Sequence, residues 1–252
     1  MTRKILFAIA ILFISLKGIS QGLFVNKAEV EYEVKTNMQK TMGNGRWADA
    51  LRESMPQFKT GYFHFIFDNG KSLYKFDHWG KPMVPDWYRR GDEESKWYFN
   101  HNNNSFTMLK SVFGTSFYVE DSLRNISWKL TNENRIIAGY NCRKAVGVIM
   151  DSVYVFAFYT DEITISGGPC SISGLPGLIL GMTIPRIYTS WMATSVNVNG
   201  GSTSAIVPPK AKKYDTLKSL GFTLKDRTKD WVESDDPDSK KWMDQLYWGT
   251  LL

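Results

Sequence analysis

GYFHFIFDNGKSLYKF, residues 61–76, is the stretch of sequence that decides the fold class. Two runs rich in aromatic and aliphatic residues flank an Asn-Gly dipeptide, which is the strongest short-range signal for a β-hairpin. Side chains alternate across a strand, so Phe63, Phe65 and Phe67 share one face, which we expect to point into the core. The stretch therefore predicts two adjacent antiparallel strands.

Strand-like patterns continue on both sides of this hairpin. Upstream, AEVEYEVK (residues 28–35) alternates apolar with charged residues, which is typical of a strand with one face in water. Downstream, short apolar runs separated by turn residues cover residues 96–99, 105–110, 117–119, 126–130, 136–148 and 153–159. Runs at this spacing indicate a β-meander. We therefore predict a mainly β protein with a single curved antiparallel sheet, half-barrel or sandwich-like, one covering helix and a C-terminal helical tail.

Three segments depart from simple alternation. Residues 46–55 are helix-like and end at Pro56, whereas residues 77–91 are rich in glycine and proline and predict a long loop between strands. SVYVFAFY, residues 152–159, is apolar on both faces. This strand is either two-sided core at the centre of the sheet or one wall of an apolar hollow, and both interpretations remain open.

The character of the chain changes in its last fifty residues. Residues 199–213 read as a linker rich in glycine, serine and proline. Apolar residues then recur at helical spacing over residues 217–224 and again over 242–246. We therefore expect an antiparallel β domain over residues 21–198, followed over residues 199–252 by the linker and a helical C-terminal appendage.

The N-terminus has the pattern of an export signal. Two basic residues precede an apolar run over residues 5–16, which is too short to span a bilayer. Gly18 and Ser20 place small residues where a signal peptidase cleaves. The sequence thus predicts a signal peptide over residues 1–20 and a mature protein in the periplasm or associated with the outer membrane. No later segment is apolar for long enough to predict a transmembrane span.

The charge balance argues against nucleic acid as a partner. The formal net charge is +6, but three basic residues lie in the predicted signal peptide. Without that segment the chain has 28 basic and 25 acidic residues. An excess this small does not make the basic surface that nucleic-acid binding needs.

Signals for a cofactor or a catalytic site are weak. GNGRWA, residues 43–48, fits a loose dinucleotide-binding pattern, but the strand before it is half charged, whereas that fold begins with a strand buried on both faces. Each of the three histidines, His64, His78 and His101, lacks a second histidine or a cysteine at ligand spacing. We therefore predict no cofactor and assign no catalytic or metal-ligating residue.

Two cysteines, Cys142 and Cys170, belong to the exported part of the chain. In an oxidising compartment they are expected to pair. The bridge would stabilise the fold by roughly 3 kcal/mol in the loop-entropy model. The alternative is two separate buried thiols.

GGPCSISGLPGLILGM, residues 167–182, is the most unusual stretch of the sequence. Its glycines permit backbone angles that side chains block, and its proline fixes one of them, so we expect a tight corner that leads into an apolar strand. Together with FYTDEITISGGP and IIAGYNCRKAVG upstream, SGLPGLILGM resembles the GLPGLI family of exported proteins found chiefly in Bacteroidota. The resemblance is strongest over residues 128–191 and extends over residues 27–198.

The resemblance implies a role in the cell envelope, because genes of that family often accompany TonB-dependent outer-membrane receptors. Many members carry an aromatic residue where this chain has Cys170, a position from which it could bridge to Cys142. This supports a structural role for the corner, whose residues are Gly174, Leu175, Pro176, Gly177, Leu178 and Ile179. We expect its three aliphatic side chains to be buried.

The leading functional interpretation is an exported, non-enzymatic envelope protein. It would bind a protein partner, such as an outer-membrane receptor, or an apolar ligand, in support of transport or assembly. A competing interpretation is an envelope hydrolase or metal-dependent enzyme, which would need His64, His78, His101, Asp68 and Asp77 to converge in a pocket. A third is a purely structural interaction protein without a small ligand.

Overall fold

The structure is a computed structural model that describes residues 25–42, 49, 52, 55–198, 206–231 and 237–252. The predicted signal peptide, residues 1–20, lies outside the described residues, as does most of the helix predicted over residues 46–55. No helix in the described part of the chain is long and apolar enough to cross a membrane.

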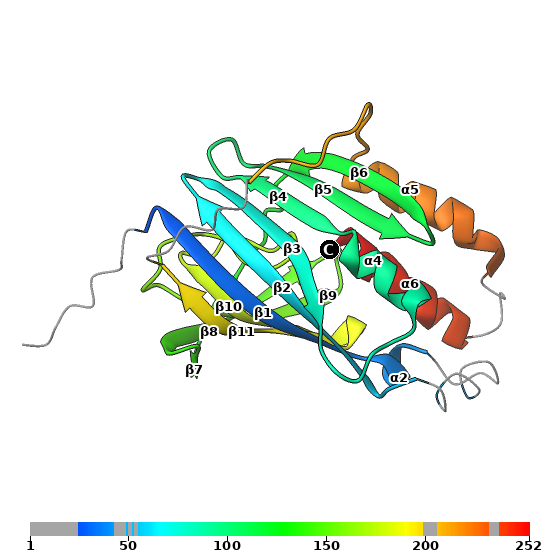
Figure 1. Ribbon diagram of the computed structural model, residues 1–252, viewed down its shortest axis with the longest axis horizontal. Coiled ribbons are helices and arrows are strands. Elements are labelled where there is room, and N and C mark those ends of the chain that lie inside the picture. The colour runs from blue at the N-terminus through cyan, green and yellow to red at the C-terminus, as the bar shows by residue number, and fades with distance from the viewer. Residues whose placement is uncertain (1–24, 43–48, 50–51, 53–54, 199–205, 232–236) are drawn as a thin grey trace, which may run out of the picture.

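In the described residues, eleven strands form one antiparallel sheet (Figure 1). They are β1 (Lys27–Asn37), β2 (Phe58–Asp68), β3 (Lys71–Trp79), β4 (Lys96–Asn100), β5 (Ser105–Val112), β6 (Thr115–Ser122), β7 (Lys129–Ile137), β8 (Tyr140–Ile149), β9 (Val153–Thr160), β10 (Leu178–Ile184) and β11 (Thr189–Asn197). Their order is β6-β5-β4-β3-β2-β1-β11-β10-β9-β8-β7. Because β1 pairs with β11, the two ends of the meander meet at the centre of the sheet.

The sheet is curved but does not close, because no pairing joins the edge strands β6 and β7 in the part of the chain that is described. Figure 1 shows the sheet wrapping around an interior, with one side left open. The predicted fold class is therefore confirmed as mainly β with one curved antiparallel sheet. The edge of β6 gains a short parallel bridge between Val119 and Asp215, which attaches the segment after β11 to the sheet.

Strand alternation decides which side chains face the interior. On β1, Val30, Tyr32 and Val34 are buried, whereas the glutamates between them lie on the outer, convex face. On β2, Phe63 and Phe65 are buried in the same core, as the hairpin pattern predicted. Phe67, predicted on the same face, is only partly buried against that core, whereas Ile66 of the opposite face is buried. The core thus lies on the concave face of the sheet.

The described part of the chain contains four helices, two of which lie at the open side of the sheet (Figure 1). They are α2 (Met38–Thr41), α4 (Asp86–Glu93), α5 (Leu217–Thr228) and α6 (Pro237–Leu251), with short 3-10 turns η1 (Pro185–Ile187) and η2 (Lys229–Trp231). Figure 1 shows α4 and α6 at the open side, with α5 beyond the β6 edge. The C-terminal helical tail is present, and α5 packs against α6 and β6.

The interval predicted as a long loop, residues 77–91, is shorter than expected. β3 runs to Trp79, and α4 begins at Asp86 directly after Pro85. Proline is well tolerated at a helix N-terminus, because the N–H that it lacks would have no partner within the helix. The proline content that indicated a loop therefore also marks the start of a helix.

The corner over residues 174–179 is buried and tightly packed. Leu175 is 2% exposed, and Leu178 and Ile179 are fully buried. Gly174 has a positive φ of 93°. Gly177 has no positive φ; its side chain is excluded because a Cβ there would lie 2.0 Å from the backbone oxygen of Thr160. The requirement for glycine at position 177 is thus a close approach of two backbones.

The predicted disulfide is wrong, because Cys142 and Cys170 are both buried free thiols. The Cys142 thiol lies on β8 and donates to the carbonyl of Tyr140 at 3.6 Å. Cys170 instead lies in the wall of the interior, near Lys110 and Trp191. Each sulfur has its own neighbours, so the corner is held by packing and by main-chain hydrogen bonds rather than by a cross-link.

Candidate ligand-binding site

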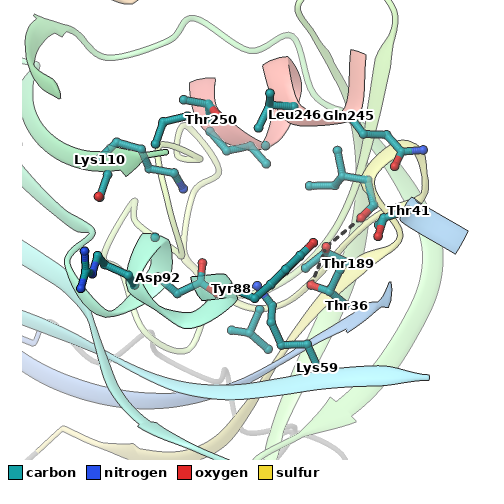
Figure 2. Close-up of a pocket in the computed structure, with 18 of the residues that line it drawn as sticks. Thr36, Thr41, Lys59, Tyr88, Asp92, Lys110, Thr189, Gln245, Leu246 and Thr250 are labelled. Carbon is teal, nitrogen blue, oxygen red and sulfur yellow. Dashed lines mark hydrogen bonds and ion pairs between the residues drawn. The ribbon is translucent and has the colours of Figure 1, made fainter. Parts of the chain in front are cut away.

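The concave face of the sheet encloses a hollow of about 850 Å³ (Figure 2). This volume lies in the range of small-molecule sites. The residues that line it are Val34, Thr36, Thr41, Met42, Lys59, Phe63, Tyr74, Asp86, Tyr88, Arg90, Gly91, Asp92, Trp97, Lys110, Ser111, Val112, Phe113, Gly114, Cys170, Ile187, Thr189, Trp191, Trp242, Gln245, Leu246, Gly249, Thr250 and Leu252. They come from β1 to β5 and β11, from α2, α4 and α6, and from turns between elements.

One wall of the hollow is aromatic. The ring of Tyr74 stacks on Phe63 with centroids 5.2 Å apart and lies 5.4 Å from the ring of Trp97. Trp191, from β11, adds a second indole. Aromatic walls give a large contact area to an apolar or ring-shaped molecule.

An ion pair occupies the wall formed by β2 and α4. The ammonium of Lys59 lies 2.5 Å from a carboxylate oxygen of Asp92, and both side chains are largely buried. Burial opposes the charge of Lys59, but the carboxylate of Asp92 outweighs this, so the pKa of Lys59 is raised. The pair is therefore charged and internally neutral.

Lys110 enters the hollow from β5, across from Lys59, as Figure 2 shows. Its ammonium lies over the indole of Trp97, 4.8 Å from the ring centroid. Burial lowers the pKa of Lys110. Among the described residues, no carboxylate lies within the 4 Å of an ion pair from this ammonium. The charge of Asp92 acts on Lys110 from farther away, but its carboxylate is bound by Lys59.

Three polar atoms of the wall are buried without a hydrogen-bond partner in the described structure: the hydroxyl of Tyr74, the indole nitrogen of Trp97 and the amide oxygen of Gln245. The Trp191 indole lies near the Tyr74 hydroxyl, but not at hydrogen-bonding geometry. Unpartnered buried polar groups are rare, because each costs about 1–3 kcal/mol. Their concentration in the wall of one hollow is typical of a site that holds a ligand or ordered water.

A second polar cluster lies on the convex face, where β1, β2 and β3 are neighbours. Atoms of Glu31, His64 and Asp77 that could ligate a metal lie within 4.8 Å of one another. A bulge in the pairing of β2 with β3 places Asp77 beside His78, whose ring nitrogen lies 2.7 Å from the Asp77 carboxylate. His64 also lies 3.5 Å from a carboxylate oxygen of Glu29. Here each polar group has a charged neighbour and is open to solvent.

The residues of the competing enzyme interpretation are only partly brought together. His64, His78 and Asp77 meet on the convex face, whereas His101 bonds Ser72 and Asp68 lies beside Lys27 in the described structure. None of the five lines the hollow. The corner residues 174–179 are also absent from its wall.

Sequence analysis missed the polar residues of the hollow, although a signal was present. Lys59 has the same strand parity as Phe63 and Phe65, and Lys110 has the same parity as Met108, so both lysines occupy core-facing positions. A lysine at such a position is unusual, because isolated buried charge is costly. SVYVFAFY, which was considered as a hollow wall, forms β9 and contributes no residue to it.

Fold and hollow together define a half-barrel domain with an enclosed interior site. A family model described as "N-glycanase peptide, N-terminal domain" matches residues 94–222, which is over half of the chain. The chain therefore belongs to this family. A comparison with curated protein sequences gives no match.

This finding corrects the resemblance to the GLPGLI family, which is wrong. The segment that suggested it, residues 167–182, lies inside the matched region. Its glycines and leucines serve a tight buried corner, a local requirement that unrelated sequences can share. The roles that rested on the resemblance, including the association with TonB-dependent receptors, are withdrawn with it.

The fold is similar to that of one solved structure, and two further structures match more weakly. The chain is similar to a crystal structure of PNGF-II in space group P21, with 17% identity and a TM-score of 0.51, over 80% of this chain and 32% of that one. A second PNGF-II structure, in space group C2, gives 16% identity and a TM-score of 0.45 over 89% of this chain and 33% of that one. An uncharacterized conserved protein from Thermus thermophilus gives 7% identity and a TM-score of 0.39, over 83% of this chain and 98% of that one. The chain spans about a third of the length of the PNGF-II structures.

Proposed function

We propose that this protein is an exported, non-enzymatic binding domain whose hollow takes a small apolar ligand. The observation that carries the proposal is the hollow itself: about 850 Å³, walled by aromatic side chains and bordered by buried polar groups without partners in the described structure. Sites for small molecules have this composition, with mostly apolar walls and a few polar groups that orient the ligand.

The position of the polar residues favours binding over catalysis. The histidines considered for an enzyme lie outside the hollow, and among the described residues the side chains that could together ligate a metal lie on the convex face. The family description names an N-terminal domain of an N-glycanase. We infer that such a domain contributes binding, with any bond-breaking chemistry belonging to other parts of the longer relatives.

Gly249 offers a direct test. It lies on α6 in the wall of the hollow, and a Cβ at this position would meet no atom within 4 Å. Gly249→Trp should therefore fill the hollow without a backbone clash, and loss of a helical glycine favours folding by roughly 0.5–1 kcal/mol. The matched control is Phe222→Trp, since Phe222 lies on α5 with 65% of its surface exposed.

The measurement is fluorescence titration with N-phenyl-1-naphthylamine, a neutral apolar probe that brightens in apolar surroundings. We expect saturable one-to-one binding to the wild type and to the Phe222→Trp control. The Gly249→Trp variant should lose at least tenfold in affinity while its thermal midpoint is maintained or rises. Equal binding by both variants, or no binding by the wild type, would refute the hollow as a ligand site.

A further inference from the structure

We propose that the ligand of the hollow is a monoanion: a small apolar or aromatic molecule that ends in a carboxylate, which pairs with Lys110. This inference rests on the proposed function and adds the chemical class of the ligand. The observation behind it is the Lys110 ammonium, which lies inside the mostly apolar hollow and forms no ion pair with any of the described residues.

Lys110 is placed to receive an anion. Its ammonium lies over the face of Trp97, which stabilises a cation, and within the described part of the chain it donates no hydrogen bond. A buried charge costs free energy unless it is paired, and burial accordingly lowers the pKa of this side chain. A bound carboxylate would supply the missing counter-charge and would accept the hydrogen bonds of the ammonium.

The charge of the wall favours one negative charge and no more. The charged lining residues are Lys59, Lys110 and Arg90 against Asp86 and Asp92. Lys59 and Asp92 neutralise each other at 2.5 Å, while the Asp86 and Arg90 side chains are mostly exposed at the rim. Of the charged side chains that line the hollow in the described structure, Lys110 alone lies inside without an ion-pair partner. A dianion such as a phosphomonoester would bring a second negative charge with no free side-chain cation among these residues to pair with it.

The neighbouring donors specify the geometry of the head group. Tyr74 and Trp97, whose rings lie 5.4 Å apart, each carry a buried O–H or N–H without a partner in the described structure. The Lys110 ammonium lies over the Trp97 ring, and the Tyr74 ring is the neighbour of that ring. A carboxylate has two oxygens with several acceptor positions, which suits one ammonium and a nearby neutral donor. The apolar remainder of the ligand would then lie against Phe63, Trp191 and α6.

The experiment compares ligands that share one hydrocarbon chain and differ only in the head group. Dodecanoate, 1-dodecanol and dodecyl phosphate are titrated by calorimetry into the wild type, the Lys110→Met variant and the Lys96→Met control. Lys96 lies on the adjacent strand β4 but is exposed and outside the hollow. The same comparison is repeated with an aromatic acid, 1-naphthoate, and its alcohol, 1-naphthalenemethanol. The two pairs together distinguish a site for fatty acids from one for aromatic acids.

We expect the wild type and the Lys96→Met control to bind dodecanoate, or the aromatic acid, at least about tenfold more tightly than the matching alcohol, and more tightly than the phosphate. In the Lys110→Met variant this preference should vanish while alcohol binding persists, which shows that the variant is folded. An alcohol that binds the wild type as well as its acid refutes the monoanion and leaves the hollow as a ligand site. A preference for the phosphate, or one that survives Lys110→Met, refutes the assignment too. If no ligand of either body binds, the proposed function fails as well.

Discussion

The two faces of the sheet treat polar groups in opposite ways. On the convex face, His64 lies within 4 Å of Glu29, Glu31 and Asp77, and all four side chains are reached by water. On the concave face, Tyr74, Trp97 and Gln245 carry buried polar atoms without a hydrogen-bond partner among the described residues. Lys110 lies over the Trp97 ring, with no carboxylate of the described residues within ion-pair distance. The histidines and acidic residues of the convex cluster are the types that suggest a catalytic site in a sequence. In the structure they lie within ion-pair distance of one another.

This difference between the two faces indicates that the concave face is the place to look for a binding site. Exposed ion pairs contribute little to stability and need no ligand, because water screens them. Unpartnered polar groups in a dry wall cost free energy, so their retention needs an explanation. Occupation of the hollow supplies one.

The buried thiols should be nearly inert in the folded protein. Burial raises the pKa of both Cys142 and Cys170 to about 12, so the reactive thiolate is scarce. Labelling with a thiol reagent at pH 8 should be at least about 10³-fold slower than in guanidinium chloride, because it requires global opening. Two thiols should react per unfolded chain. A control cysteine introduced as Tyr154→Cys, at a position 54% exposed on β9, should react at once.

The same thiols make the fold sensitive to alkali. A group whose folded pKa lies above its unfolded value stabilises the fold fully below the unfolded pKa, and this contribution is lost as the pH rises through the folded one. For both cysteines this stabilisation is lost as the pH rises from the ordinary pKa of 9.0 to the folded pKa of about 12.

In the labelling experiment, rapid reaction of the native protein, or fewer than two reactive thiols after unfolding, would contradict the structure.

Gly177→Ala should be the most damaging single methyl on the concave side. The added Cβ would lie 2.0 Å from the Thr160 oxygen, a backbone atom that cannot rotate away. We expect a loss of about 3 kcal/mol or more in the free energy of unfolding, measured by urea titration. Gly139→Ala is the control: it has a φ of 86° but open space around it, so the cost should be about 1 kcal/mol. A cost at Gly177 no larger than that at Gly139 would show that the backbone relaxes and that the close approach does not require glycine.

The outcome for the fold and for the site shows what a sequence can predict. Alternation around residues 61–76 was sufficient for the hairpin, the sheet and the inward face, because strand parity is local. The hollow depends on which strands face one another across the concave side of the sheet and on the cover provided by α6. Neither arrangement can be read from short-range sequence patterns. Lys59 and Lys110 are 51 positions apart and gain meaning only when β2 and β5 face one interior. The prediction of a disulfide failed for the same reason, because the presence of each cysteine in a neighbouring sequence motif does not bring the two sulfur atoms together.

Removal of a hydroxyl should distinguish partnered from unpartnered polar groups within the concave face. Tyr32 and Tyr74 are both fully buried, with ring centroids 6.1 Å apart. The Tyr32 hydroxyl donates to the Ile179 carbonyl at 2.5 Å, so Tyr32→Phe should cost about 1–2 kcal/mol. Tyr74→Phe removes a hydroxyl without a partner in the described structure, and its unfolding free energy should change by less than about 0.5 kcal/mol or increase. Chemical denaturation of the ligand-free proteins measures both, and a large loss in Tyr74→Phe would mean that its hydroxyl is satisfied.

The smallest effect belongs to the convex face. Glu31 accepts a hydrogen bond from the Thr194 hydroxyl at 2.5 Å and lies 3.7 Å from His64. Glu31→Gln keeps an acceptor for Thr194 but removes the charge, so only an exposed electrostatic interaction is lost. Such interactions contribute about 0–1 kcal/mol, and here two other carboxylates remain beside the histidine, so we expect a change of less than about 0.5 kcal/mol. The change should disappear at 1 M salt, where the screening length falls to about 3 Å. A loss above about 2 kcal/mol in urea titrations at both salt concentrations would show that the convex cluster is a structural element in its own right. The contrast between the two faces would then have to be abandoned.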